Sequence, residues 1–215
     1  MQSFKICELL FYTEFERPKG KSVIMKLIRD RILKDGKVYP GGVLKVDSFL
    51  NHQIDADLLS EAGKELYRLF GDEKITKIVT VEASGIAIAC LAAVHFGVPA
   101  VFAKKNKTVN LSDNLYTAEV ESFTHKKTYP IVIDKAYITA SDRILIVDDF
   151  LAKGHALMGL LEIAKQAGAS VAGAGIMIEK CFQGGGDALR AQGLRIESLA
   201  MIESMSDDGT IVFRD

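Results

Sequence analysis

Residues 143–170, RILIVDDFLAKGHALMGLLEIAKQAGAS, constrain the fold of this chain more than any other segment. Four apolar residues lead into two adjacent carboxylates and a short turn that contains Gly154. Apolar residues then recur at helical spacing until Gly168, which is a stop signal: Leu157, Leu160, Leu161 and Ala164. An apolar strand that runs directly into an amphipathic helix is typical of a parallel sheet covered by helices on both faces.

The same alternation of strands and helices continues along the chain. Helices are predicted over 25–36, over 55–70 with Asp55 as the N-cap, and near 185–193. Residues 77–97 indicate a strand, a glycine turn and a helix, and further strands are predicted at 98–105, 170–180 and 194–202. Two hairpins are expected, one from 116–123 and 129–138 and one in the tail at 207–213. We therefore expect an α/β fold with a mostly parallel twisted sheet flanked by helices, in one domain over residues 25–215.

Residues 1–24 look foreign to this domain, because they are broken by charge and precede the helix that starts at Met25. We expect them to be an extension, either weakly ordered or leader sequence upstream of a true start at Met25. The alternative is an additional helix that packs its apolar residues onto the domain.

Composition excludes several classes of function. The 215 residues carry a formal net charge of -1 and no long basic run, which argues against nucleic-acid binding. The three cysteines, Cys7, Cys90 and Cys181, are widely spaced, which argues against disulfides and zinc and fits a cytoplasmic protein. No apolar run reaches the ~18 residues needed to cross a bilayer, so no membrane association is expected.

The turn at residues 152–156 is suited to bind an anion. It lies where a helix begins, so its backbone N–H groups have no intrahelical acceptors and lie at the positive end of the helix dipole. Gly154 lacks a Cβ and therefore lets a phosphate approach the backbone closely. We call residues 152–156 the phosphate turn.

Asp148 and Asp149 precede the phosphate turn, although carboxylates repel phosphate. They are suited to accept hydrogen bonds from neutral hydroxyls, such as those of a ribose whose 5-phosphate lies in the turn, and to favour positive charge developing at a sugar carbon. The alternative is an ordinary strand-to-helix turn whose acids only cap the helix. Other phosphate motifs fail, since GKS at 20–22 has Phe15 where a P-loop requires glycine.

An apolar strand, two acids, a small-residue turn and a helix resemble the signature of the type I phosphoribosyltransferases, which bind phosphoribosyl pyrophosphate (PRPP). The stretches VLKVDSFLNHQID, ITKIVTVEASGIA, VPAVFAKK, LIVDDFLAKGHA and GIMIEKCFQ resemble most closely the bacterial purine phosphoribosyltransferases that act on xanthine. The resemblance extends from about residue 25 to the end of the chain.

The resemblance implies a homodimeric cytoplasmic enzyme of purine salvage. It would transfer the 5-phosphoribosyl group of PRPP to N9 of xanthine, giving xanthosine 5'-monophosphate and pyrophosphate. Mg²⁺ would be held through PRPP, with no metal ligand from protein side chains. The fold would carry a small hood made of N- and C-terminal segments.

The resemblance also implies roles for individual residues. Asp148 and Asp149 would face the ribose in the catalytic centre, and Leu44, Asn51 and Lys180 would contact xanthine. The residues that would bind the 5-phosphate are Ala152, Lys153, Gly154, His155 and Ala156. Lys153 and His155 replace two amides that are usual in the family, which leaves their side-chain contacts open.

Further PRPP contacts are expected at two other strand ends. The amides of Ala83, Ser84 and Gly85 open a helix and are suited to hold pyrophosphate, unless this is only a structural turn. Lys104 and Lys105 would lie near the leaving pyrophosphate beneath a lid at roughly 104–125, unless they are merely solvated. For Lys180 the alternative is a surface pair with Glu179.

Three other functions stay open at this point. Nothing in residue spacing distinguishes xanthine from guanine or hypoxanthine. A PRPP-sensing regulator would need a nucleic-acid-binding element, and none is evident. A phosphohydrolase would need further metal ligands besides Asp148 and Asp149.

Overall fold

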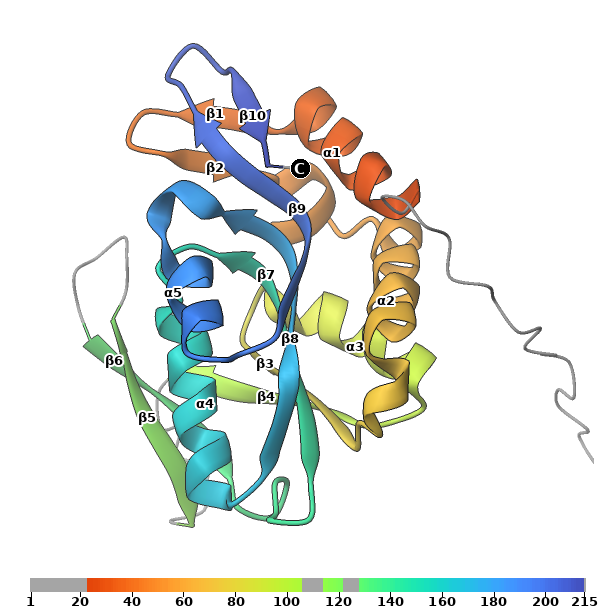
Figure 1. The fold of residues 1–215 in the computed structure, drawn as a ribbon, viewed down its shortest axis with the longest axis vertical. Helices are drawn as coiled ribbons and strands as arrows, with labels where there is room; N and C mark the ends of the chain where they lie inside the picture. The colour runs from red at the N-terminus through yellow and green to blue at the C-terminus, as the bar shows by residue number, and fades with distance from the viewer. Residues whose placement is uncertain (1–22, 106–113, 122–127, 215) are drawn as a thin grey trace, which may run out of the picture.

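A computed structural model describes residues 23–105, 114–121 and 128–214 of the chain (Figure 1). The expectations for residues 1–22 and for most of the lid lie outside these residues. The main sheet has 8 strands in the order β10-β9-β8-β7-β3-β4-β6-β5. The strands β9, β8, β7, β3 and β4 run parallel, and antiparallel strands close both edges. The expected α/β architecture is confirmed.

The helices and strands follow the predicted order closely. The helices are α1 (Val23–Asp35), α2 (Ala56–Phe70), α3 (Gly85–Phe96), α4 (His155–Ala167) and α5 (Gly185–Ala191). The strands of the main sheet are β3 (Lys77–Val81), β4 (Ala100–Lys105), β5 (Leu115–Glu121), β6 (Thr128–Asp134), β7 (Arg143–Leu151), β8 (Ser170–Lys180), β9 (Ile196–Met205) and β10 (Ile211–Phe213). A separate hairpin consists of β1 (Lys37–Tyr39) and β2 (Val43–Lys45).

Local chemistry explains where α2 and α4 begin and end. The side chain of Asp55 accepts a hydrogen bond from the amide of Leu58 at 3.1 Å, as expected of an N-cap. Gly168 has a left-handed backbone (φ 71°) and ends α4, since a left-handed glycine satisfies the last carbonyls of a helix. Both helix boundaries predicted from these residues are confirmed.

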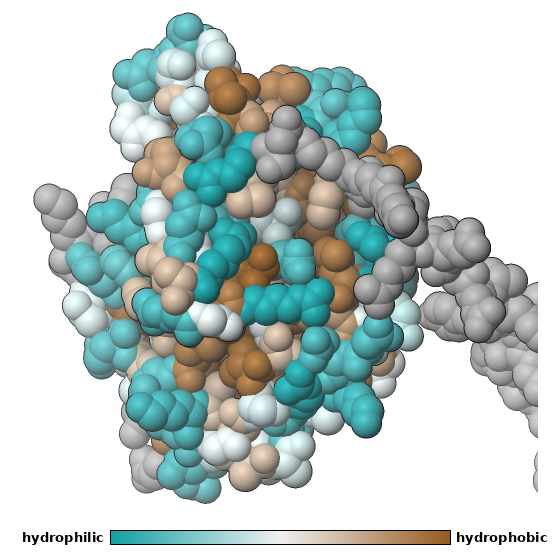
Figure 2. All heavy atoms as spheres, in the orientation of Figure 1, coloured by the Kyte–Doolittle hydropathy of each residue, from teal (hydrophilic) through white to brown (hydrophobic). Residues whose placement is uncertain are grey.

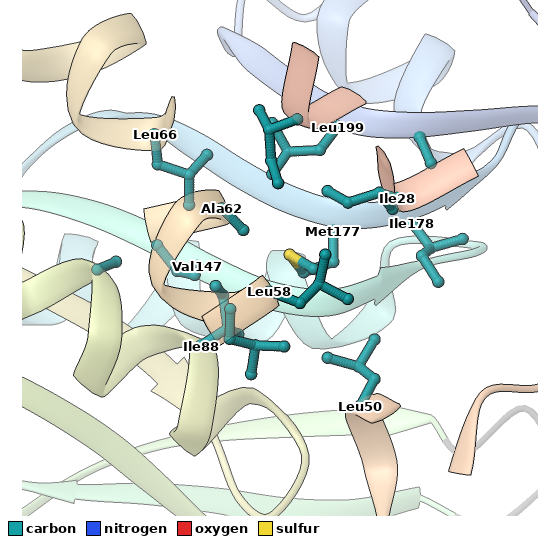
Figure 3. Close-up of a cluster of buried hydrophobic side chains, with 14 of the residues drawn as sticks. Ile28, Leu50, Leu58, Ala62, Leu66, Ile88, Val147, Met177, Ile178 and Leu199 are labelled. Atoms are coloured by element: carbon teal, nitrogen blue, oxygen red, sulfur yellow. The ribbon is translucent and has the colours of Figure 1, made fainter. Parts of the chain in front are cut away.

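Two clusters of buried side chains lie on opposite faces of the sheet. Alternate residues of β7 point to different faces, so Leu145 and Val147 pack with α2 and α3 while Ile144 and Ile146 pack with α4. Figure 3 shows the first cluster, in which side chains from helices and from the sheet converge. Burial on both faces explains why β7 and β8 are continuous apolar runs rather than alternating ones.

N- and C-terminal segments gather at one end of the sheet, where Figure 1 shows α1, the β1–β2 hairpin and β10 side by side. The guanidinium of Arg29 in α1 donates to the carbonyl of Arg214 at 2.7 Å and lies over the ring of Phe213. These contacts form the small hood that the resemblance implied.

The segment between α1 and α2 differs from the sequence prediction. One extended piece and a loop were expected, whereas the chain forms the β1–β2 hairpin and then a π-helical turn at Asp47–Asn51. Gly41 and Gly42 both have positive φ (81° and 74°), which suits the tight turn of a hairpin. Three-residue strands are too short to show the alternation from which strands are predicted.

The surface is mixed in character. Figure 2 shows hydrophilic residues over most of the face that carries α4, α5 and β9, with hydrophobic residues between them. Across the described part of the chain, no helix combines the length and the apolar character that crossing a membrane requires.

Candidate functional site

The strand order places three polar strand ends at one edge of the sheet. After β3 the chain continues to β4 on one side, whereas β7 leads to β8 on the other, so the direction of winding reverses between β3 and β7. Ligands of open α/β sheets bind outside the carboxyl ends of the strands at such a reversal. The ends of β3, β7 and β8 are therefore neighbours.

A cavity of about 260 Å³ lies at this edge. Its wall includes the whole phosphate turn together with Asp148, Lys105 and Tyr129. Residues at the start of a helix, an aspartate and a lysine therefore border the same cavity. This combination can bind a ligand that has both anionic and hydroxyl groups.

The phosphate turn has the expected geometry. Gly154 has φ 82°, a left-handed conformation that favours glycine, and α4 begins at the next residue, His155. A Cβ on Gly154 would also lie 2.9 Å from Cδ1 of Leu189 in α5. The turn is thus specified both by its backbone conformation and by a close neighbour.

The side chain of His155 points away from the turn toward β5. Its Nδ1 lies 3.1 Å from the carbonyl oxygen of Glu121, to which it donates, and 3.9 Å from the carboxylate of the same residue. His155 therefore links the start of α4 to the end of β5. The imidazole of His155 is therefore engaged by β5.

Asp148 and Asp149 are both buried and lie within β7, which continues to Leu151. The amide of Asp149 donates to Oδ1 of Asp148 at 3.0 Å, and Asp148 borders the cavity. Burial and the neighbouring charge of Asp149 raise the pKa of Asp148 well above its usual value. A buried acid whose pKa is raised by burial and by a neighbouring charge is typical of a functional site.

The turn after β3 approaches Asp148 closely. A Cβ on Gly85 would lie 2.8 Å from Oδ1 of Asp148 and 2.0 Å from Oγ1 of Thr80, so only glycine fits there. The peptide bond between Glu82 and Ala83 is cis. The amides of this turn and the acid of β7 therefore border the same region.

Lys105 at the end of β4 supplies positive charge to the cavity. Its amide donates to Oε1 of Glu82 at 2.5 Å, and its ammonium lies over the ring of Tyr129, 5.7 Å from the ring centroid. Burial, followed by the charge of Asp148, raises the pKa of Tyr129, which keeps the phenol protonated. Lys104 points to the other face of β4.

Lys180 ends β8 near the hood. Its ammonium donates to the carbonyl of Gly42 at 2.9 Å and lies 5.2 Å from the centroid of the Phe150 ring. Burial lowers the pKa of Lys180. Its neighbour Glu179 is fully buried and pairs with Arg190 at 2.6 Å, so the alternative of a Glu179–Lys180 surface pair is wrong.

Comparison with known proteins decides the family. Residues 45–184 match the family model described as the phosphoribosyl transferase domain. The chain belongs to the phosphoribosyltransferase family. It is 56% identical over 191 residues to a protein of Lachnoclostridium phytofermentans named xanthine phosphoribosyltransferase, covering 88% of this chain and 98% of that protein. A Bacillus cereus protein of the same name is 55% identical over 189 residues, covering 88% and 95%.

Solved phosphoribosyltransferase structures share the fold. An adenine phosphoribosyltransferase from Thermoanaerobacter pseudethanolicus superimposes with a TM-score of 0.60 and 26% identity, covering 67% of this chain and 81% of that one. The enzyme from Giardia lamblia gives a TM-score of 0.69 at 20% identity, covering 80% and 96%. The fold predicted from the phosphoribosyltransferase signature is confirmed.

The structure brings some of the predicted site residues together and leaves others apart. The phosphate turn, Asp148 and Lys105 line one cavity, and Gly85 borders Asp148. Leu44 of β2 is buried in the hydrophobic core, whereas Asn51 is exposed at the end of the π-helical turn. The purine-contacting roles of Leu44, Asn51 and Lys180 in this phosphoribosyltransferase stay predictions.

Sequence reasoning missed two residues at the cavity. Tyr129 comes from β6, and Glu121 comes from the end of β5. Both occupy ordinary positions in a predicted hairpin, and the distant pairing of that hairpin with β4 brings them to the site. No local signal distinguishes them.

Proposed function

We propose that this protein transfers the 5-phosphoribosyl group of PRPP to N9 of xanthine, with xanthosine 5'-monophosphate and pyrophosphate as products. The observation that carries the proposal is the shared cavity, which is lined by both the phosphate turn and Asp148. The choice of xanthine rests on the relatives that bear that name at 54–56% identity.

The proposed reaction assigns a separate task to each part of the site. The phosphate turn binds the 5-phosphate through backbone amides, and Asp148 and Asp149 accept hydrogen bonds from the ribose hydroxyls. The two carboxylates favour the positive charge that develops at ribose C1 as its bond to pyrophosphate breaks. Purine N9 then attacks C1 from the opposite face. Catalysis comes from positioning and electrostatics, without a protein nucleophile.

Pyrophosphate leaves on the side of β3 and β4. The amides of Ala83, Ser84 and Gly85 lie at the start of α3, where the helix dipole favours negative charge. Lys105, at the cavity wall, adds positive charge at the end of β4, whereas Lys104 points to the other face of that strand and is left out of this role. These groups stabilise the departing anion in our proposal.

The donor set fits Mg²⁺ that arrives with PRPP. Among the described residues, no three histidine, cysteine or acidic side chains form a metal cluster. Mg²⁺ is commonly held by one or two carboxylates together with substrate phosphates and water. In our proposal the phosphates of PRPP hold the ion without a ligand from protein side chains, and Mg²⁺ would neutralise negative charge on the diphosphate.

The purine is proposed to bind between the hood and the end of β8. Lys180 would donate to an exocyclic purine oxygen, which a buried ammonium with spare donors can do. Leu44 lies in the hairpin whose Gly42 already accepts a hydrogen bond from Lys180. Asn51 would supply a donor and an acceptor to the purine edge.

One experiment separates the proposal from its alternatives. The protein is incubated with Mg²⁺-PRPP and with xanthine, guanine, hypoxanthine or no base, and pyrophosphate release is followed. We expect release that depends on a base and is fastest with xanthine. Faster release with guanine or hypoxanthine would correct the substrate, release without a base would indicate hydrolysis, and no release would indicate a PRPP sensor.

We further propose a homodimer that works in the cytoplasm as part of purine salvage. The dimer follows from the resemblance, and the compartment from cysteines that show no paired spacing. Analytical ultracentrifugation gives the mass in solution, and a mass of one chain would contradict the dimer.

A further inference from the structure

We propose that Gly185, together with the ion pair between buried Glu179 and half-buried Arg190, holds the phosphate turn in its binding geometry. These are positioning residues in α5 and β8, outside the set that contacts substrate. The proposal rests on the function proposed above, because it concerns PRPP binding at the same turn.

The start of α5 lies directly against the phosphate turn. The amide of Gly185 donates to the carbonyl of Ala152 at 3.1 Å. A Cβ on Gly185 would lie 2.3 Å from that carbonyl oxygen, 2.4 Å from the carbonyl carbon of Lys153 and 2.7 Å from the nitrogen of Gly154. All three contacts are with backbone, so even one added methyl group must displace the turn.

The next residue of α5 lies equally close to a buried acid. A Cβ on Gly186 would lie 2.0 Å from Oε1 of Glu179. Two consecutive glycines thus let α5 lie between the phosphate turn and the end of β8. In Figure 1, α5 lies next to the N-terminal end of α4, where the phosphate turn leads into that helix.

Arg190 fixes α5 in this place. Its guanidinium donates to both oxygens of Glu179, at 2.7 and 2.6 Å, and Ser198 of β9 donates to the same carboxylate. Glu179 is fully buried, so removing these donors would leave a buried carboxylate without its partners. A bidentate pair restricts orientation as well as distance, and it therefore sets how α5 presents Gly185 to the turn.

The same pair connects the two substrate subsites. Glu179 directly precedes Lys180, which is proposed to bind the purine, while Arg190 and Gly185 belong to one short helix. A change in the pair should therefore act on PRPP first, through α5, and on xanthine less, because Lys180 is also held by Gly42 and Phe150.

The test compares Gly185→Ala with Gly71→Ala. A Cβ on Gly71 would meet only the ring of Tyr67, at 3.5 Å, so this control adds the same methyl group without a clash. For Gly185→Ala we expect the KM for PRPP to rise about tenfold, as for one lost hydrogen bond to a charged group, with the KM for xanthine changed less than about twofold. Gly71→Ala should behave as wild type.

A second pair of variants covers the case in which Gly185→Ala does not fold. Arg190→Met removes the donors to Glu179, whereas Arg190→Lys restores one. We expect the KM for PRPP to rise in Arg190→Met and to recover partly in Arg190→Lys. A merely structural role would lower the melting temperature and leave this KM unchanged in the folded fraction.

Calorimetric titration with Mg²⁺-PRPP, without any base, separates this proposal from the proposed function. Wild-type protein that binds PRPP but releases no pyrophosphate with any base would overturn the function, and weaker binding by the variants would still support positioning. If the wild-type protein catalyses the reaction and the folded variants bind PRPP with unchanged affinity, only the positioning proposal is overturned.

Discussion

Asp148 illustrates how the side chain to which we assign a role in the site lowers the stability of the fold. Burial and Asp149 raise its pKa, so the folded protein binds a proton more tightly there than the unfolded chain does. The contribution of this group to stability is therefore complete at acidic pH and is lost as the pH rises through the raised pKa. At neutral pH the fold therefore bears the cost of burying this acid beside Asp149.

Replacing Asp148 by asparagine should raise the stability of the fold and lower its activity. The amide keeps the shape and the acceptor for the amide of Asp149 but carries no charge. We expect the free energy of unfolding to rise by about 1 kcal/mol at pH 7, and kcat to fall at least about a hundredfold. Urea unfolding and steady-state kinetics measure the two effects. The gain should shrink toward pH 4, and a loss of stability at pH 7 would contradict the argument.

At the scale of elements, Asp142 fastens the beginning of β3 to the segment before β7. Its carboxylate accepts from Nζ of Lys77 at 2.8 and 2.9 Å, and Thr76 and the amide of Thr139 donate to it as well. Burial opposes ionisation, but these donors together lower the pKa of Asp142 from 3.8 to about 2. The cluster lies at the amino ends of the strands, opposite the cavity.

The substitution Asp142→Asn should therefore lower the free energy of unfolding and leave kcat unchanged. A lowered folded pKa adds stability that is complete above the usual pKa of 3.8 and is lost as the pH falls toward 2. We expect a loss of about 2 kcal/mol at pH 7, with kcat unchanged. Urea unfolding from pH 7 to 3 should show the wild type and variant converging on the acid side. A constant difference across that range would assign the effect to packing instead.

The elements differ in how far the sequence predicts them. Strands β3, β7 and β8 are apolar runs, and Asp55 and Gly168 mark helix ends. The residues of each segment are therefore enough to predict these elements. The β1–β2 hairpin escapes prediction because its strands are too short for a pattern. Tyr129 and Glu121 reach the cavity only through pairing between distant strands, which no single segment encodes.

At the scale of the whole molecule, the buried side chains of both clusters, as far as the described residues form them, run from Ile24 to Ile202. Helix α1 contributes Ile24, Ile28 and Ile32, each nearly or fully buried. We therefore propose that residues 25–215, with the first turn of α1, form one domain whose stability does not depend on residues 1–22.

Removing residues 1–22 should leave the protein intact. We expect a change in Tm of less than about 2 °C, which corresponds to less than about 1 kcal/mol for a domain of this size, and an unchanged kcat. Removing residues 1–35 is the matched control, because it deletes three buried isoleucines at roughly 2–5 kcal/mol each. Calorimetry measures both, and a large drop in Tm for the shorter deletion would show that the first residues belong to the core.

Burial of β7 on both faces also has a consequence for the unfolded chain. Ile144, Leu145, Ile146 and Val147 form a strand-prone segment that would associate with copies of itself when exposed. Asp148 and Asp149 follow it immediately, and charges flanking such a segment act as gatekeepers against aggregation. Replacing Asp148 by asparagine would therefore give a more stable native state that is recovered less efficiently from denaturant at high protein concentration.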